Sequence, residues 1–159
     1  MLVVEPDEDD APASRAAPAL VRAKPSWLLN QAATVANRSV AEALAGVDAR
    51  RYHYALLAAL DEMGASSQAD LSRATSIDRS DMVATINELV DRGFVARTPD
   101  PADRRRNVII LSGAGRRQLR KLDRLLGKVQ EGLLAPLSPD EREQLVDLLT
   151  RLVGHHTTP

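Results

Sequence analysis

Two closely spaced helix-start signals constrain this chain more than any other feature. Ser67-Gln-Ala-Asp70 and Asp78-Arg-Ser-Asp81 each place a capping side chain three residues before a carboxylate that can bond back to the cap. The first helix is short, because the tight connection Thr75-Ser76-Ile77 follows it. The second ends at Gly93, and its inward stripe is expected to be Val83, Ile86, Leu89 and Val90. This pattern predicts a helix-turn-helix.

A β-hairpin is predicted directly after these helices. Residues 94–97 and 107–111 are rich in β-branched and aromatic residues, which favour strands, and the polar segment 98–106 lies between them. Ser112 can then cap a long helix over 113–134, and Ser138-Pro-Asp-Glu141 is a sharp start signal for a final helix. The long helix carries a narrow apolar seam with 3-4-3-4 spacing, formed by Leu119, Leu122, Leu126, Val129 and Leu133.

The N-terminal part of the chain contains a polar tail and two further helices. Residues 1–24 are acidic and interrupted by prolines, so we expect them to be disordered. Pro25-Ser26 offers a helix start and Gly46 a helix end, after which Asp48 can cap a helix that ends near Gly64. We therefore expect a tail over 1–24 and one domain over 25–159.

Composition agrees with a mainly α fold that carries one small β-hairpin. Aromatic residues make up 3% of the 159 residues and apolar residues 44%, so the core must be built mainly from Leu, Val, Ile and Ala. The chain has no cysteine, its three histidines lack metal-ligand spacing, and it has no phosphate-binding loop. We therefore expect no enzyme activity, no metal and no cofactor.

No apolar run approaches the roughly 20 residues that span a bilayer, and the N-terminus is acidic where a signal peptide would be basic. The expected location is therefore the cytoplasm, without a membrane partner.

Charge is balanced overall and concentrated locally. The formal net charge is −1, yet residues 104–128 hold nine basic residues against one acid, Asp123. By itself such a run indicates a solvated helix face. In a hairpin that follows a helix-turn-helix it indicates a nucleic-acid footprint, because the order helix, helix, short helix, turn, helix, hairpin is that of a winged helix-turn-helix. A winged unit that binds another protein, without operator specificity, is the alternative.

The sequence resembles the MarR family of transcriptional regulators over roughly residues 26–154. The segments that carry the resemblance are Ser67-Gln-Ala-Asp-Leu71, Ile77-Asp-Arg-Ser80, Leu89-Val-Asp-Arg-Gly-Phe-Val95, Asp100-Pro-Ala-Asp-Arg-Arg105 and Leu111-Ser-Gly-Ala-Gly115. The wing pattern Asp-Pro-x-Asp-Arg-Arg is the most specific of these. The resemblance implies a homodimeric, ligand-responsive regulator of double-stranded DNA, with a pseudo-palindromic operator. The lobe 48–112 would bind DNA, and helices at 25–46 and 113–155 would form the dimer.

The resemblance also places the DNA contacts. Arg105 matches a wing arginine that enters the minor groove, Asp103 an acid that braces the wing, and Arg104 and Arg106 suit phosphates. Ser67 and Gln68 begin a helix with free N–H groups. In the recognition helix we expect outward side chains that reach base edges in the major groove, namely Arg79, Ser80, Asp81 and Thr85.

Acidic residues outnumber basic ones in this recognition helix, so affinity must depend on the wing and on backbone contacts. Asp81 can either accept a hydrogen bond from a cytosine amino group or stabilise the helix dipole, and the sequence leaves both roles open.

A small aromatic or apolar anion is the expected effector. The candidate ligand-binding residues are Trp27, Arg50, Tyr52 and His53, for which simple packing is the alternative role. The expected dimer contacts are Leu119, Leu122, Leu126, Val129, Leu145, Leu149 and Leu152. The operator sequence, the sign of regulation and the role of the tail do not follow from the sequence.

Overall fold

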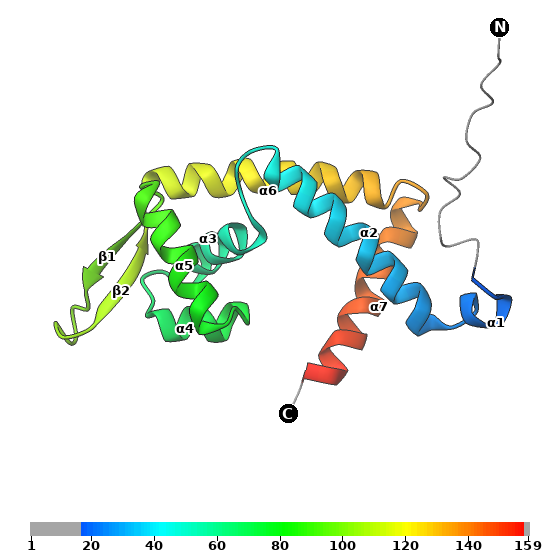
Figure 1. Ribbon diagram of the computed structural model, residues 1–159, viewed down its shortest axis with the longest axis horizontal. Helices are drawn as coiled ribbons and strands as arrows, with labels where there is room; N and C mark the ends of the chain where they lie inside the picture. Colours follow the sequence, from blue (N-terminus) through cyan, green and yellow to red (C-terminus); the bar gives the residue numbers. More distant parts are fainter. Residues whose placement is uncertain (1–16, 158–159) are drawn as a thin grey trace, which may run out of the picture. The chain divides into compact units, whose positions relative to one another are not determined.

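The computed structural model describes residues 17–157, which form seven helices and one β-hairpin (Figure 1). In chain order the elements are α1 (Ala19–Arg22), α2 (Pro25–Ala45), α3 (Arg51–Met63), α4 (Gln68–Thr75), α5 (Arg79–Asp91), β1 (Val95–Pro99), β2 (Asn107–Leu111), α6 (Gly113–Leu133) and α7 (Pro139–Thr157). The chain divides into two compact units, residues 1–38 and 39–159, with the boundary inside α2. The predicted mainly α fold with a small hairpin is confirmed. None of the described helices is long and apolar enough to cross a membrane.

The predicted disordered tail is wrong in its last part. Ala19–Arg22 form α1, which follows Pro18, and Pro25 begins α2 shortly afterwards. Pro25 occupies the first helical position, where its missing N–H costs nothing. The prediction for residues 1–16 concerns a segment outside the described residues.

Four predicted helix starts are confirmed. At each one a side-chain oxygen accepts a hydrogen bond from the backbone N–H three residues further on, at 2.9–3.3 Å. The capping residues are Ser67, Asp78, Ser112 and Ser138. The Ser138 N–H in turn donates to the Glu141 carboxylate at 2.8 Å, which completes a capping box. These starts depend on contacts within one helical turn, so the local sequence determines them.

The expected cap at Asp48 is wrong. Asp48 has a positive φ of 51° in the turn after α2, and α3 begins only at Arg51. The residue before the helix is Arg50, whose N–H donates to the Nδ1 atom of His53 at 3.2 Å. The histidine ring at the third helical position thus takes the role that a Glu or Gln side chain has in a capping box.

The core of the second unit is almost entirely aliphatic. The largest fully buried side chains are Leu44, Leu56, Leu57, Leu60, Leu71, Met82, Ile86, Leu89 and Leu122. They come from the end of α2 and from α3, α4, α5 and α6, and the hairpin adds Val95 and Ile109. This core holds the helix-turn-helix, α4 and α5, against α3 and the base of the hairpin.

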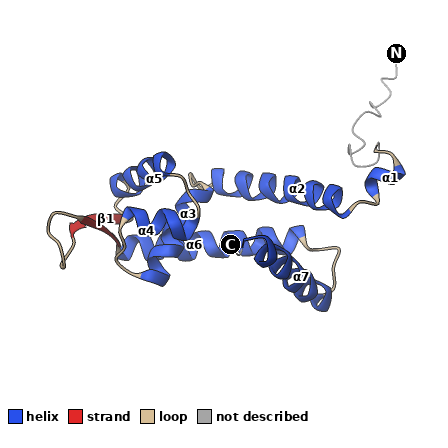
Figure 2. Ribbon diagram, turned by 90° about the horizontal axis from the view of Figure 1, so that it is seen from below, coloured by secondary structure: helices blue, strands red, loops and turns tan. Residues whose placement is uncertain are grey.

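The hairpin projects beyond the helices (Figure 2). β1 and β2 pair antiparallel from Val95 opposite Leu111 to Pro99 opposite Asn107. Ser66, in the connection before α4, adds a short third pairing: its N–H donates to the Ile109 carbonyl at 3.1 Å, and the Ile109 N–H donates to the Ser66 carbonyl at 2.8 Å. The base of the wing is therefore bonded to the helix-turn-helix.

A glycine seats α6 against the start of the wing. Gly115 is buried in the first turn of α6, and a Cβ atom there would lie 2.0 Å from the carbonyl oxygen of Phe94. The Ser112 hydroxyl donates to the carbonyl oxygens of Gly93 and Phe94, at 2.7 and 3.0 Å. Only glycine permits this close approach of two backbones.

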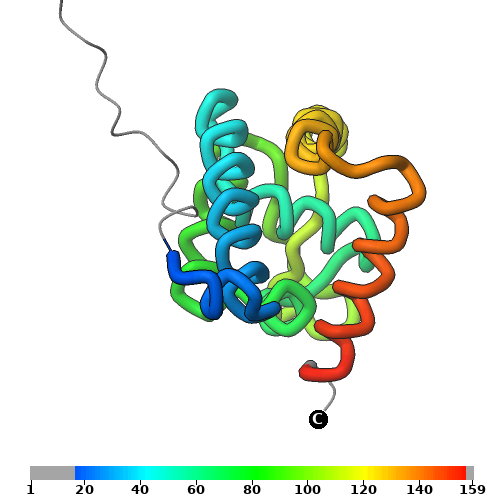
Figure 3. Tube along the Cα trace, turned by 90° about the vertical axis from the view of Figure 1, so that its right-hand side faces the viewer, coloured from blue at the N-terminus to red at the C-terminus, as the bar shows by residue number. Residues whose placement is uncertain are grey.

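Helices α6 and α7 are only partly covered by their own chain; Figure 3 looks nearly along α6, with α7 leaving its end. Leu122 is fully buried in the core, and Leu119 and Leu126 pack against it. The expectation that Leu122 lies in a dimer interface is therefore wrong, since the α6 seam contacts α3. By contrast α7 exposes a row of apolar side chains, namely Val146, Leu148, Leu149, Leu152 and Val153.

Candidate nucleic-acid interface

The recognition helix α5 buries one face and exposes the opposite one. Met82, Thr85, Ile86 and Leu89 are buried. Thr85 is only 5% exposed, so its expected position on the outer face is wrong. Val83, expected inside, is 39% exposed. The structure places on the outer face Arg79, Ser80, Val83, Ala84 and Asn87, with Asp81 half-buried at its border.

The first turn of α5 is organised by Asp78. One oxygen of its carboxylate accepts from the Ser80 N–H at 2.9 Å, the Asp81 N–H at 3.1 Å and the Ser80 hydroxyl at 2.7 Å. The Asp81 N–H and the Ser80 hydroxyl hold the pKa of the Asp78 carboxyl below its usual value. Asp78 therefore acts as the helix cap, as its spacing predicts, and its carboxylate is hydrogen-bonded to donors of its own helix.

A hollow of about 560 Å³ brings together several of the predicted DNA-binding residues. Its lining comes from α4, from the start of α5 and from the second strand of the wing: Ser67, Gln68, Ala69, Ser72, Arg79, Arg106 and Asn107. The Ser67 hydroxyl also donates to the Asp70 carboxylate at 2.5 Å, which lowers the pKa of that carboxyl. Two arginines and the start of α4 thus border one concave surface, which suits an anion.

The tip of the wing is held in shape by two aspartates. The Asp100 carboxylate accepts from the Ala102 N–H at 2.9 Å, and the Asp103 carboxylate accepts from the Arg105 N–H at 3.1 Å. The Asp103 carbonyl also accepts from the Arg106 N–H at 2.9 Å. Such turns from Asx side chains fix short polar loops. Arg104, Arg105 and Arg106 are all exposed on this loop.

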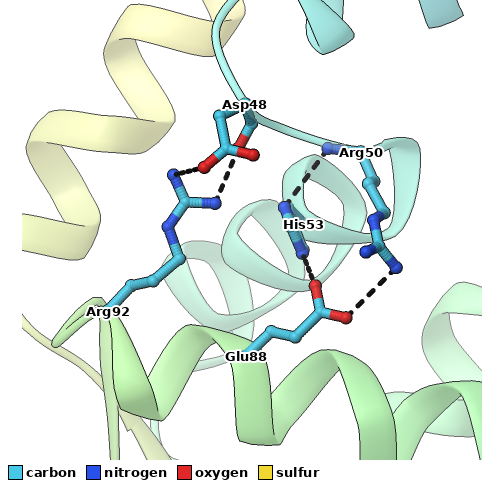
Figure 4. A network of polar contacts seen from close by, with 5 residues as sticks. All are labelled: Asp48, Arg50, His53, Glu88 and Arg92. Carbon is cyan, nitrogen blue, oxygen red and sulfur yellow. Dashed lines mark hydrogen bonds and ion pairs between the residues drawn. The ribbon is translucent and has the colours of Figure 1, made fainter.

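A polar network ties α5 to the start of α3 (Figure 4). His53 is 4% exposed, and its Nε2 atom lies 2.8 Å from the carboxylate of Glu88 on α5. Since Nδ1 accepts from the Arg50 N–H, the ring proton lies on Nε2, which donates to Glu88. The Arg50 guanidinium pairs with the other oxygen of Glu88 at 3.1 Å. Glu88 thus accepts a hydrogen bond from His53 and pairs with the positive charge of Arg50.

A second contact joins the same two regions (Figure 4). The Arg92 guanidinium, one turn after Glu88, donates to the Asp48 carbonyl at 2.6 Å and lies 3.5 Å from the Asp48 carboxylate. Its guanidinium carbon also lies 5.2 Å from the centre of the Phe94 ring. The turn between α2 and α3 is thus bonded to the second half of the recognition helix.

The predicted effector residues are only partly brought together. Arg50 and His53 border a hollow of about 470 Å³ with Arg92, and Arg50 and Tyr52 border another of about 300 Å³ with Asp81. Trp27 lies on α2 in the other compact unit, half-buried. The burial and bonding of His53 match its alternative role as a packed histidine. No group of three potential metal ligands occurs among residues 17–157.

Three outward residues of the recognition helix escaped sequence reasoning: Val83, Ala84 and Asn87. The side-chain oxygen of Asn87 accepts from the Arg97 guanidinium of β1 at 2.6 Å. The available signal was the spacing of Arg79, Val83 and Asn87, one helical turn apart, which places all three on one face.

Comparisons with known proteins agree with this architecture. The profile described as the MarR family matches residues 45–106. The transcriptional repressor NicR of Pseudomonas putida is 30% identical over 100 residues, which are 63% of each chain. The chain spans only 60–63% of the length of the curated relatives that it matches first.

Solved structures match over more of their length. BpsR of Bordetella bronchiseptica, whose DNA binding is regulated by 6-hydroxynicotinic acid, is 26% identical with a TM-score of 0.74, and the match covers 86% of this chain and 98% of BpsR. A protein of Pseudomonas aeruginosa assigned as a transcriptional regulator is 32% identical, with a TM-score of 0.72 and coverage of 82% and 97%. The matched relatives are regulators rather than enzymes. This chain belongs to the MarR family of winged helix-turn-helix proteins.

Proposed function

We propose that this protein is a homodimeric, ligand-responsive repressor that acts in the cytoplasm on double-stranded DNA. Helix α5 enters the major groove of each half-site of a pseudo-palindromic operator, and Arg105 enters the adjacent minor groove. The supporting observation is the continuous surface formed by the exposed face of α5, the basic hollow beside Arg79 and Arg106, and the wing tip. Regulation of transcription by NicR and DNA binding by BpsR support the same role.

Two of the four acids of α5 and its cap are engaged within the fold, which reduces their cost to DNA binding. Asp78 caps the helix, and Glu88 pairs with His53 and Arg50. The phosphate contacts are assigned to Ser67, Gln68, Arg104 and Arg106, which lie along the hollow and the wing, and contacts to base edges to Arg79, Ser80 and Asp81 at the start of α5. Asp103 braces the wing through the Arg105 N–H.

The homodimer is assigned to the apolar surface that α7 leaves exposed. Leu149 and Leu152 are exposed, and Leu145 and Val129 are half-buried within the single chain. A row of exposed apolar residues on one helix is typical of an interface. Sedimentation at low micromolar concentration should give about twice the 17.3 kDa chain mass. A folded monomer at that concentration would contradict the assignment.

The effector is proposed to be a small aromatic or apolar anion. The aromatic acid that regulates BpsR has this chemistry. In this chain two hollows offer guanidinium groups next to partly apolar walls, one beside Arg50, His53 and Arg92 and one beside Arg50 and Tyr52. The first also contains Asp48, Glu88 and Asp91 and the second Asp81 and Glu88, so an anion must compete with these carboxylates for the guanidinium groups. Trp27 fluorescence, followed together with operator release, tests a panel of phenolic and carboxylate compounds. A panel that alters neither signal at millimolar concentration would contradict a ligand-responsive mechanism.

Selection of bound duplexes from a random DNA pool, with the purified full chain, tests the function directly. We expect a pseudo-palindrome whose half-sites are centred about one helical turn apart. With about six to ten phosphate contacts per dimer, log affinity should fall against log salt with a slope near −5 to −9. A slope near zero, or no selected sequence, would instead favour a winged module that binds protein.

A further inference from the structure

The centre of the exposed face of α5 is apolar. Val83 and Ala84 lie there between the polar residues Arg79 and Ser80 at the helix start and Asn87 one turn later. Both side chains end in methyl groups and can neither donate nor accept a hydrogen bond. A single exposed valine is ordinary on a protein surface. This valine, however, lies in the middle of a recognition helix, at the place where base edges would lie, so it is positioned to contact a base.

These two residues have a basic surface on one side. That flank is the hollow that contains Arg79 and Arg106. The hollow on the other side, which contains Ala84 itself, has mixed charge, because Arg50 is joined there by Asp81 and Glu88. A backbone phosphate would therefore lie at the basic flank, with the base edges over Val83 and Ala84. The basic flank is thus complementary to a DNA duplex whose major groove faces the apolar centre.

Two polar neighbours of Val83 and Ala84 already have partners within the fold. The Asn87 side-chain oxygen accepts from the Arg97 guanidinium, and Glu88 is bonded to His53 and Arg50. The methyl groups of Val83 and Ala84 are therefore the groups that the middle of α5 presents most directly to a base edge. In the major groove the one apolar group on a base edge is the 5-methyl group of thymine.

We infer that Val83 and Ala84 select thymine by packing against its 5-methyl group, so that each operator half-site carries a thymine opposite the middle of α5. This inference rests on the proposed DNA-binding function and gives it a chemical basis for sequence preference. The half-site is then read by an apolar contact at its centre and by polar contacts around it.

Replacement of thymine by deoxyuridine isolates the contact, because the two bases differ only by the methyl group. Burial of one such group corresponds to about a fourfold change in affinity, from roughly 0.8 kcal/mol. A dimer makes the contact twice, so changing the same thymine in both half-sites should weaken binding about fifteenfold. Each thymine of the selected operator is replaced in turn, and affinity is measured by fluorescence anisotropy at fixed salt.

The protein variants make the test specific. Val83→Ala removes the larger apolar side chain from an exposed position. Replacement of the contacted thymine by deoxyuridine should therefore weaken DNA binding less in this variant than in the parent. The logarithm of the fold loss in affinity should be about half the parent's value or smaller. Ala84→Ser, a second change on the same face, should do the same in smaller measure. Val21→Ala, a valine of α1 that is 40% exposed, is the matched control and should respond to deoxyuridine like the parent.

The possible outcomes separate this inference from the proposed function. Operator binding that changes less than twofold at every thymine, or an unchanged deoxyuridine effect in Val83→Ala, would overturn the thymine contact and leave operator recognition intact. Failure to select any duplex would overturn the proposed function together with this inference. A deoxyuridine effect at one symmetric thymine that is reduced in Val83→Ala as expected, and keeps the parent value in the control variant, supports it.

Discussion

The recognition helix and the wing differ in how their polar groups are used. On α5, Asp78 serves as a cap, Glu88 bonds to His53 and Arg50, and Asn87 holds Arg97. At the wing tip the fold uses backbone N–H groups and two aspartates, and among the described residues no hydrogen bond or ion pair engages the guanidinium groups of residues 104–106. Under the proposed function, the middle of the helix would then contribute shape and apolar contact, while the wing would contribute most of the charge. Sequence preference and affinity would depend on different segments of the chain.

Arg105→Ala should have the largest effect on DNA binding. A good arginine contact in a groove contributes about 1–3 kcal/mol. With two wings per dimer, operator affinity should fall about a hundredfold or more, while the fold and the dimer stay intact. Anisotropy at two salt concentrations measures the loss. Arg151→Ala, which removes an exposed arginine of α7, is the control, and equal effects of the two changes would show that Arg105 makes no specific contact with DNA.

Gly115→Ala tests whether stability depends on the close approach of α6 to the start of the wing. The new Cβ atom would lie 2.0 Å from the Phe94 carbonyl, so the backbone must move and unfolding should become easier by about 3 kcal/mol. Gly127→Ala is the matched control: it lies in the same helix with nothing within 4 Å of the added atom, and alanine there should stabilise by about 0.5–1 kcal/mol. Urea denaturation measures both. Similar stabilities would show that the close approach is unimportant.

His53→Ala should loosen the recognition helix. It leaves the Arg50 N–H and one Glu88 oxygen without their partner at a partly buried position and empties the space of a buried ring, at a cost of about 1–3 kcal/mol. Arg50→Ala removes only the exposed side of the same network, since its side chain is 71% exposed, and should cost under about 1 kcal/mol. Thermal denaturation compares the two. A larger loss for Arg50→Ala would show that the surface ion pair, rather than the buried imidazole, holds α5.

Acid should weaken the start of α5 by a small amount. The folded protein lowers the pKa of the Asp78 carboxyl, so this group contributes stability above its ordinary value of 3.8, and the contribution is lost as the pH falls through the lowered folded value. Asp78→Asn keeps a capping oxygen without the titration. Its stability should therefore vary less with pH below 4 than that of the parent. Parallel curves for the two proteins in acid denaturation would contradict the role of the charge.

The sequence predicts the boundaries of these elements better than it predicts their orientation. The helix starts at Ser67, Asp78, Ser112 and Ser138 follow from contacts within one turn, and β2 also has the expected bounds. The inward face of α5 does not follow in this way. By spacing, either Met82 or Val83 could belong to the apolar stripe that continues to Ile86. In the structure Met82 is the buried one, so the helix is oriented with Thr85 facing inward and Val83 facing outward.

Two further differences have the same origin in tertiary contacts. Leu122 fits a coiled-coil seam by spacing, but α3 covers it within the same chain. Asp48 has the chemistry of a cap, but the chain turns through a left-handed conformation there, and a histidine three residues into α3 bonds to the residue before the helix. A local sequence pattern does not show which distant residues will contact it, and in these cases the distant contacts determine the outcome.

The Ser66–Ile109 pairing has a consequence for the order of folding. It joins two backbone segments that are separated in sequence by α4, α5 and β1, so its formation closes a long loop. Closing this loop costs conformational entropy, which the packing of the enclosed helices must offset. The base of the wing should therefore acquire protection from hydrogen exchange together with α4 and α5 during refolding, and not before them. The DNA-binding lobe would then appear as one cooperative step, in which the wing cannot form while the helix-turn-helix is still unfolded.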